Sequence, residues 1–178
     1  MTEFESATTH IPPDRLRVWS FHPATWVLVP LAAILFQVYV PRFLSYLSYL
    51  ELPLLVTVYF SVMRRNPPAG ALTGCLVGLA QDSLSHHYLG LNGIAKTLIG
   101  YLAASISLRF DVDNAGLRFL MGFGFFVAHQ VVLWVLSHAL LGTHETLHVP
   151  QTVIAAFLNA VVALPLFQVL DRLKSEAR

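Results

Sequence analysis

The sequence predicts an all-α polytopic membrane protein with six transmembrane helices. Of its 178 residues, 56% are hydrophobic and only 12% are charged, whereas about a quarter of the residues of a soluble domain are charged. Apolar runs long enough to cross a bilayer recur along the chain between short polar turns. The net charge of +1 is too small to suggest a nucleic-acid ligand.

The predicted domain organisation is simple. Residues 1–22 form a cytoplasmic tail and interfacial segment, 23–171 the six-helix transmembrane domain, and 172–178 a cytoplasmic tail. The first residues are polar, contain Pro12-Pro13 and lack the basic start and apolar core of a signal peptide. The first apolar run is therefore expected to stay in the membrane as a span.

Five of the six spans can be bounded directly from the apolar runs, and they cover residues 24–40, 69–85, 89–108, 117–141 and 151–170. The second span is ambiguous, because 54–63 is strongly apolar but too short to cross a bilayer at 1.5 Å per residue. Either the helix begins near Phe43 and bends at Pro53, or residues 43–50 lie along the membrane interface.

The basic residues predict the orientation. With six spans and both termini in the cytoplasm, the outer side receives only Arg42, and Lys96 lies within a span. The cytoplasmic side receives the remaining basic residues: Arg15, Arg17, Arg64, Arg65, Arg109, Arg118, Arg172, Lys174 and Arg178. This asymmetry follows the positive-inside rule.

Two ionisable residues fall within adjacent antiparallel spans, Asp82 in the third and Lys96 in the fourth. Asn92 shares a helix face with Lys96. Because charges are expensive in lipid, we expect Asp82, Asn92 and Lys96 to form a buried polar network. This network could fix the register of the helices or serve as an ion or substrate relay, and the sequence leaves both readings open.

Small residues recur every four positions at Gly70, Gly74 and Gly78, and Gly100 lies on the same face of the next span as Lys96. This spacing is typical of close helix packing in membranes. The packing partner could be another helix of this chain or the membrane helix of another protein.

A zinc-hydrolase motif, H-E-x-x-H, occurs from His144 to His148. It requires a helix, but Gly142 and Pro150 leave about two turns, and a third metal ligand is needed. We therefore expect no metal, no cofactor and no catalytic residue. His129 and Asn159 lie near the middle of their spans, where interhelical hydrogen bonding is favoured over a proton pathway.

The residues around the third and fourth spans resemble those of the rod shape-determining protein MreD family. A basic turn precedes a glycine-rich helix that ends in G-L-A-Q-D, followed by Y-L-G-L-N-G and a helix with a G-Y pair. The matching positions are Arg64, Pro67, Gly70, Gly74, Gly78, Asp82, Gly90, Asn92, Gly93, Gly100 and Tyr101. The segment from Glu51 to Leu55 is similar to the family's entry into its second helix, whereas Lys96 lies outside the pattern.

The resemblance implies a non-enzymatic scaffold in the bacterial inner membrane. Its expected partners are the bitopic protein MreC, the actin-like MreB, and the transpeptidase and SEDS glycosyltransferase that build lateral peptidoglycan. The basic turn at Arg64-Arg65 would contact cytoplasmic partners or anionic lipid. The family is also thought to share its fold with the S components of energy-coupling-factor transporters, so a vitamin-binding subunit is the alternative, ahead of a zinc peptidase.

Overall fold

The structure is a computed structural model that describes residues 20–21, 23–85, 89–110, 112, 114–142 and 148–175. Within these residues the chain forms six α-helices, and this confirms the predicted all-α membrane fold. They are α1 (Pro23–Tyr39), α2 (Leu52–Arg64), α3 (Pro67–Ser85), α4 (Leu91–Ser107), α5 (Ala115–Leu141) and α6 (Val149–Asp171). Two 3₁₀ turns, η2 (Val40–Arg42) and η3 (Ser45–Tyr49), connect α1 to α2.

The structure excludes one of the two readings of the second span, a helix that begins near Phe43 and bends at Pro53. Leu50 has an extended backbone (φ −92°, ψ 125°), so η3 is separate from α2, and no single helix runs from Phe43 through Pro53. The combined stretch Leu47–Arg64 is long and apolar enough to cross a membrane, as are α5 and α6. Among the described residues, α1 contributes a shorter apolar helix over Ala24–Tyr39.

Helix ends follow the local chemistry of the sequence. Proline occupies the first turn of α2, α3 and α6, where its missing N–H costs no helical hydrogen bond. The Asn114 side chain caps α5 by accepting a hydrogen bond from the Gly116 N–H. At the other end of α5, Gly142 adopts the left-handed conformation (φ +61°) that commonly terminates a helix.

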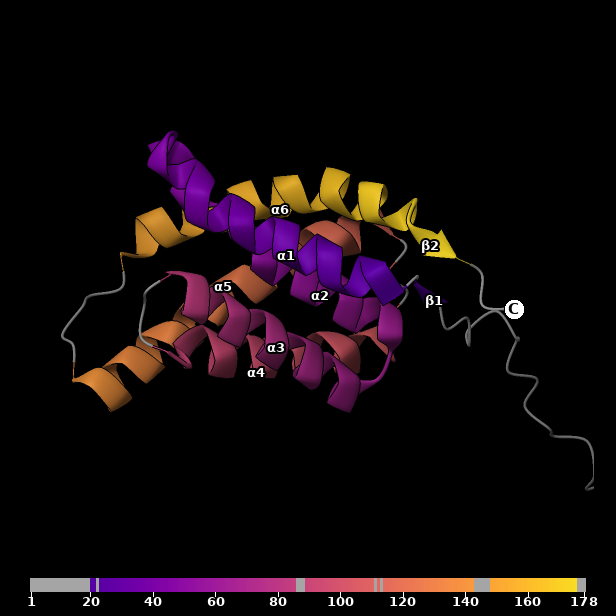
Figure 1. Cartoon of the computed structure of the whole chain (residues 1–178), viewed down its shortest axis with the longest axis horizontal. Helices are drawn as coiled ribbons and strands as arrows, with labels where there is room; N and C mark the ends of the chain where they lie inside the picture. Colours follow the sequence, from indigo (N-terminus) through magenta and orange to yellow (C-terminus); the bar gives the residue numbers. More distant parts are fainter. Residues whose placement is uncertain are drawn as a thin grey trace, which may run out of the picture.

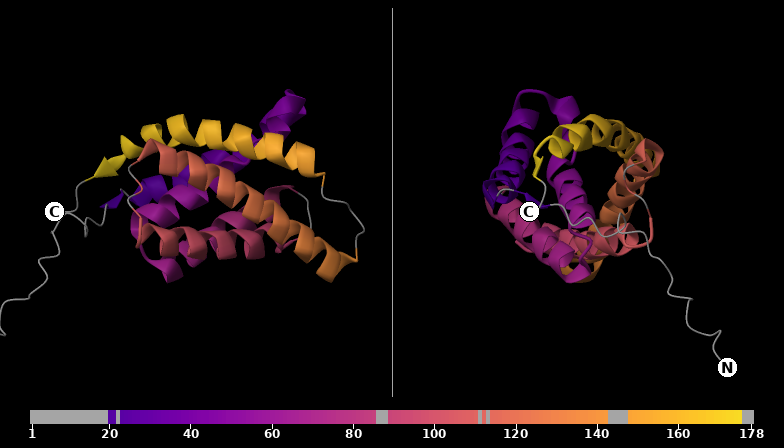
Figure 2. Two further views of the ribbon diagram at one scale, coloured as in Figure 1. Left: turned by 180° about the vertical axis from the view of Figure 1, so that it is seen from behind. Right: turned by 90° about the vertical axis from the view of Figure 1, so that its right-hand side faces the viewer.

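The bundle is built around α2, whose residues from Pro53 to Met63 are all buried. The end-on view shows the other helices arranged around it (Figure 2). Aromatic side chains fix their packing: the Trp26 ring on α1 stacks on Phe60, and the Phe167 ring on α6 lies 5.2 Å from Tyr59. A helix that is apolar on all sides is expected at the centre of a bundle.

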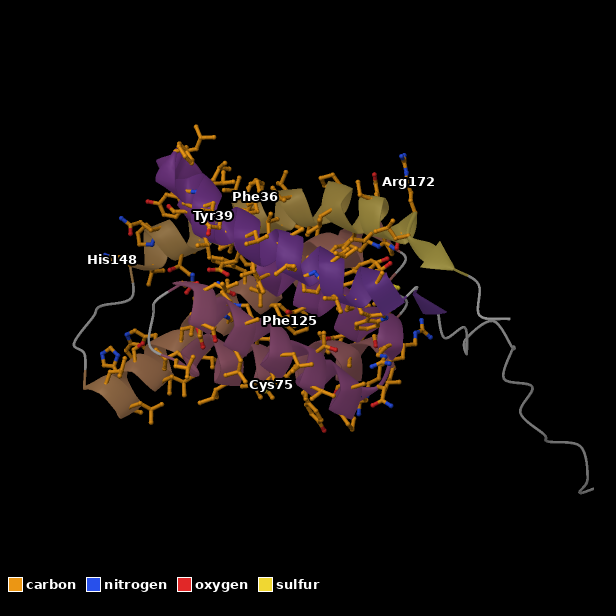
Figure 3. The ribbon with its side chains drawn as sticks, in the orientation of Figure 1. Phe36, Tyr39, Cys75, Phe125, His148 and Arg172 are labelled. Atoms are coloured by element: carbon orange, nitrogen blue, oxygen red, sulfur yellow. The ribbon has the colours of Figure 1, made fainter. Side chains whose placement is uncertain are left out.

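The two described ends of the chain meet. Two-residue strands β1 (Ser20–Phe21) and β2 (Lys174–Ser175) pair in antiparallel register, with Ser20 opposite Ser175 (Figure 1). We call this the strand-pair end of the bundle and the opposite one the far end. Arg172 lies at the strand-pair end and His148 at the far end (Figure 3).

Candidate functional site: a buried polar cluster

Lys96 lies in the second turn of α4, and its side chain is completely buried. Its Nζ atom donates a hydrogen bond to Asn92 Oδ1 at 3.0 Å and lies 3.2 Å from His129 Nε2 and 3.7 Å from Glu51 Oε2. An ammonium group can only donate, so the hydrogen bond between the two side chains runs from Lys96 Nζ to His129 Nε2. The lysine thereby joins α4 to α5 and to the residue that precedes α2.

Asp82, near the end of α3, closes the turn into α4. Its carboxylate accepts hydrogen bonds from Asn92 Nδ2 (2.9 Å), the Gly90 N–H (2.8 Å) and the Gly93 N–H (3.2 Å). Gly90 has a φ of +102°, a conformation that other residues rarely adopt. Asn92 accepts from Lys96 and donates to Asp82, so the two charges are joined through Asn92.

Asn159, fully buried on α6, holds the start of α2. Its Oδ1 accepts a hydrogen bond from the Glu51 N–H at 2.9 Å, and its Nδ2 donates to the carbonyl oxygens of Tyr49 and Ala155. The resulting buried polar cluster connects α3, α4, α5 and α6 with the residue that precedes α2. It consists of Glu51, Asp82, Asn92, Lys96, His129 and Asn159. The structure thus brings the three predicted polar residues together and adds Glu51, His129 and Asn159.

The glycines of α3 pack against the backbone of α4. A Cβ atom at Gly70 would overlap the Gly100 carbonyl oxygen, and one at Gly74 would overlap the Lys96 carbonyl oxygen. At Gly78 it would meet the carbonyl carbon of Asn92 at 2.6 Å. The glycine face of α3 is therefore occupied by α4, and a helix of another protein cannot pack there.

A second polar contact, which sequence reasoning missed, lies at the strand-pair end. Arg118 Nη1 on α5 donates to Asp171 Oδ2 on α6 at 2.6 Å, and Tyr59 on α2 donates to Asp171 Oδ1 at 2.8 Å. Arg118 Nε also donates to the Val112 carbonyl at 2.9 Å. The sequence places Arg118 and Asp171 near the same membrane surface but gives no signal that they pair.

The basic turn joins α2 to α3. Arg64 is exposed, and its guanidinium lies 4.7 Å from the centre of the Trp26 ring, within cation–π distance. Arg65 has a left-handed backbone (φ 48°) that ends α2, and the Asn66 side chain accepts from the Ala69 N–H. Arg64 is therefore presented at the surface of the strand-pair end.

The zinc motif lies largely outside the described residues, which include neither His144 nor Glu145. His148 is described, and it is an exposed residue that immediately precedes α6. Among the described residues, no group of three His, Cys, Asp or Glu side chains is placed to hold a metal ion.

These features define the class of the protein: it is a helical membrane protein whose buried polar side chains form hydrogen bonds and ion pairs with one another. The chain matches the family model of the rod shape-determining protein MreD over residues 20–173, and it belongs to that family. It therefore has a role in rod-shape determination. Neither the curated proteins nor the solved structures compared with the chain gave a match.

Proposed function

We propose that this protein is a non-enzymatic scaffold subunit of the cell-elongation complex in the bacterial inner membrane. It binds the bitopic protein MreC and links the MreB cytoskeleton to the transpeptidase and SEDS glycosyltransferase of lateral peptidoglycan synthesis. The family match supports this function, because it spans residues 20–173 and so covers the described bundle from β1 to the end of α6.

The internal packing suits a scaffold, which must present a constant surface. The α3–α4 contact leaves no room for a side chain at Gly74, and Lys96 is held by groups from three elements. These groups interact within the bundle, so we assign the buried polar cluster to structural support in preference to a relay. Polar interactions of this kind fix the relative positions of membrane helices.

The strand-pair end is proposed to face the cytoplasm. Arg64, Arg109 and Arg172 are exposed there, at the ends of α2, α4 and α6. Such a concentration follows the positive-inside rule and suits contacts with cytoplasmic partners or anionic lipid. Both termini would then be cytoplasmic.

The partner helix is proposed to pack on an outward-facing apolar surface, because the glycine face of α3 is filled by α4. The opposite side of α3 offers large apolar side chains, with Leu72 58% exposed and Leu76 61% exposed. A photo-crosslinking residue placed at Leu72 or Leu76 tests this surface, and one at the buried Ile99 is the matched control. Crosslinks to a bitopic partner from the exposed positions alone would support it.

The broader test is affinity purification of the tagged chain from its native cells in mild detergent, read by mass spectrometry. Recovery of an MreC protein with cell-wall synthases supports the scaffold. Recovery of paired ATPases with a membrane coupling subunit would instead support a vitamin-transporter S component. Recovery of the chain alone with stoichiometric zinc would support a peptidase.

A further inference from the structure

The far-end halves of α5 and α6 diverge from each other. Among the described residues, His129 is the last buried residue of α5, although the helix continues to Leu141. On α6, the first buried residue is Ala155, although the helix begins at Val149. Figure 2 shows the two helices moving apart toward the far end of the bundle. Neither of these two helix halves therefore buries the other.

One side of α5 is directed at α6. The Phe119 ring packs edge-on against the Phe157 ring of α6, with the ring centres 5.6 Å apart. Gln130 follows Phe119 by eleven residues and precedes Ser137 by seven, so at about 3.6 residues per turn all three lie on the same side of α5. This side is covered by α6 near the strand-pair end, where Phe157 meets it, and is left uncovered where the helices diverge.

The uncovered part of this side carries polar groups. We call its half-buried residues Gln130, Trp134 and Ser137 the polar side of α5. The opposite side of the same turns is apolar, with Val131 43% and Val135 49% exposed, and suits contact with lipid chains. Polar side chains within membrane spans normally face protein, and here they are confined to the side that α6 leaves uncovered.

Gln130 is the residue that needs a partner. It lies eleven residues before Leu141, about 16 Å at 1.5 Å per residue, and so falls within the hydrocarbon region. Within the described residues its amide makes no hydrogen bond, whereas the adjacent His129 is bound by Lys96. Lipid chains offer neither donors nor acceptors, so leaving the amide against them is costly. A neutral amide both donates and accepts, and a hydroxyl or another amide satisfies it.

We propose that the polar side of α5 docks a transmembrane helix of another protein, which packs between the far-end halves of α5 and α6. This helix carries a hydroxyl or amide side chain at the level of Gln130, because interhelical hydrogen bonds of this kind hold membrane helices together. Since α4 packs between α3 and α5, the surface is separate from that of Leu72 and Leu76. The protein therefore has room for two membrane helices on different sides.

Photo-crosslinking of the full chain in its native cells tests the proposal, with the captured peptide mapped by mass spectrometry. A photo-crosslinking residue at Ser137 should capture a transmembrane segment of another protein. One at Val135, on the opposite side of α5, is the matched control and should capture none. The absence of such a capture from Ser137, a second copy of this chain as the captured protein, or equal capture from both positions would overturn the proposal.

The variant Gln130→Leu tests the role of the amide. It should lower the crosslinking yield from Ser137 about fivefold, since one interhelical hydrogen bond is lost. It should leave the Tm of the purified chain unchanged, whereas Asn159→Leu, which removes three hydrogen bonds within the bundle, should lower the Tm. An unchanged yield would overturn the proposal, and so would a Tm lowered as much as by Asn159→Leu, because the amide would then act within the chain.

Discussion

The α3–α4 pair and the α5–α6 hairpin are attached to the bundle by different chemistry. Between α3 and α4, backbone meets backbone, and the carbonyl oxygens of one helix lie where side chains would begin on the other. The hairpin is tied to the remaining helices by polar side chains, through Lys96 and His129, Glu51 and Asn159, and Tyr59 and Asp171. The protein should therefore lose stability when a larger side chain is placed between α3 and α4. It should also lose stability when a polar side chain that ties the α5–α6 hairpin to the bundle is replaced by an apolar one.

Gly74→Leu should have the largest effect. A Cβ atom alone would overlap the Lys96 carbonyl oxygen, so α3 and α4 would have to separate. Overpacking typically lowers the free energy of unfolding by about 1–3 kcal/mol, and we expect a loss at or above the upper end of this range. We expect loss of the monodisperse protein, measured by size-exclusion chromatography in detergent. Gly124→Leu is the matched control on α5, where a Cβ would meet no atom within 4 Å. Normal folding of Gly74→Leu would contradict the packing account.

Lys96→Met should destabilise the protein by about 3–5 kcal/mol, because it leaves the Glu51 carboxylate buried without its partner. Combining it with Glu51→Gln should restore part of this loss, since the unpaired charge is then removed. A double-mutant cycle on the Tm measures the coupling. Additive effects of the two substitutions would show that the two side chains are not coupled.

Tyr59→Phe should have a smaller effect, about 1–2 kcal/mol, because it removes one hydrogen bond to a carboxylate that Arg118 still neutralises. The loss should appear as a lower Tm with unchanged oligomeric state. Tyr101→Phe, on an exposed residue of α4, is the control and should leave the Tm unchanged. Equal effects of the two substitutions would argue against a role for the Asp171 contact.

Gly124→Ala should have the smallest effect on stability, and it should stabilise the protein where the other substitutions destabilise it. The position is exposed and open, so alanine should stabilise α5 by up to about 1 kcal/mol through its higher helix propensity. Gly122→Ala, two residues earlier, should destabilise, because its Cβ would lie 2.9 Å from the Ala163 Cβ on α6. Thermal unfolding of the two variants side by side checks the predicted difference in sign.

Much of the fold could be predicted from the sequence because apolar runs and glycine spacing are local signals. The four-residue repeat at Gly70, Gly74 and Gly78 indicated a tight helix contact, but only the structure shows that α4 fills it. The break before α2 was ambiguous, because a 3₁₀ turn and a bent helix can share the same apolar pattern.

The candidate site was only partly predictable. Polar residues are rare in membrane spans, so the sequence indicates Asp82, Asn92 and Lys96 as candidates. Asn92 and Lys96 are also one helical turn apart. Glu51 lies between two helical segments, and its approach to Lys96 depends on how α2 and α4 pack. The pairing of Arg118 with Asp171 likewise joins distant parts of the chain, so no local pattern could indicate it.

We propose that the buried polar cluster holds the helices of a scaffold subunit in place and takes no part in an ion or substrate relay. The most direct test is to replace the chromosomal copy with the double variant Glu51→Gln and Lys96→Met, and to measure cell shape and MreC recovery at wild-type protein level. We predict rod-shaped cells and normal recovery of MreC. Round cells, despite a folded protein with its partner bound, would contradict the account and assign the cluster an active role.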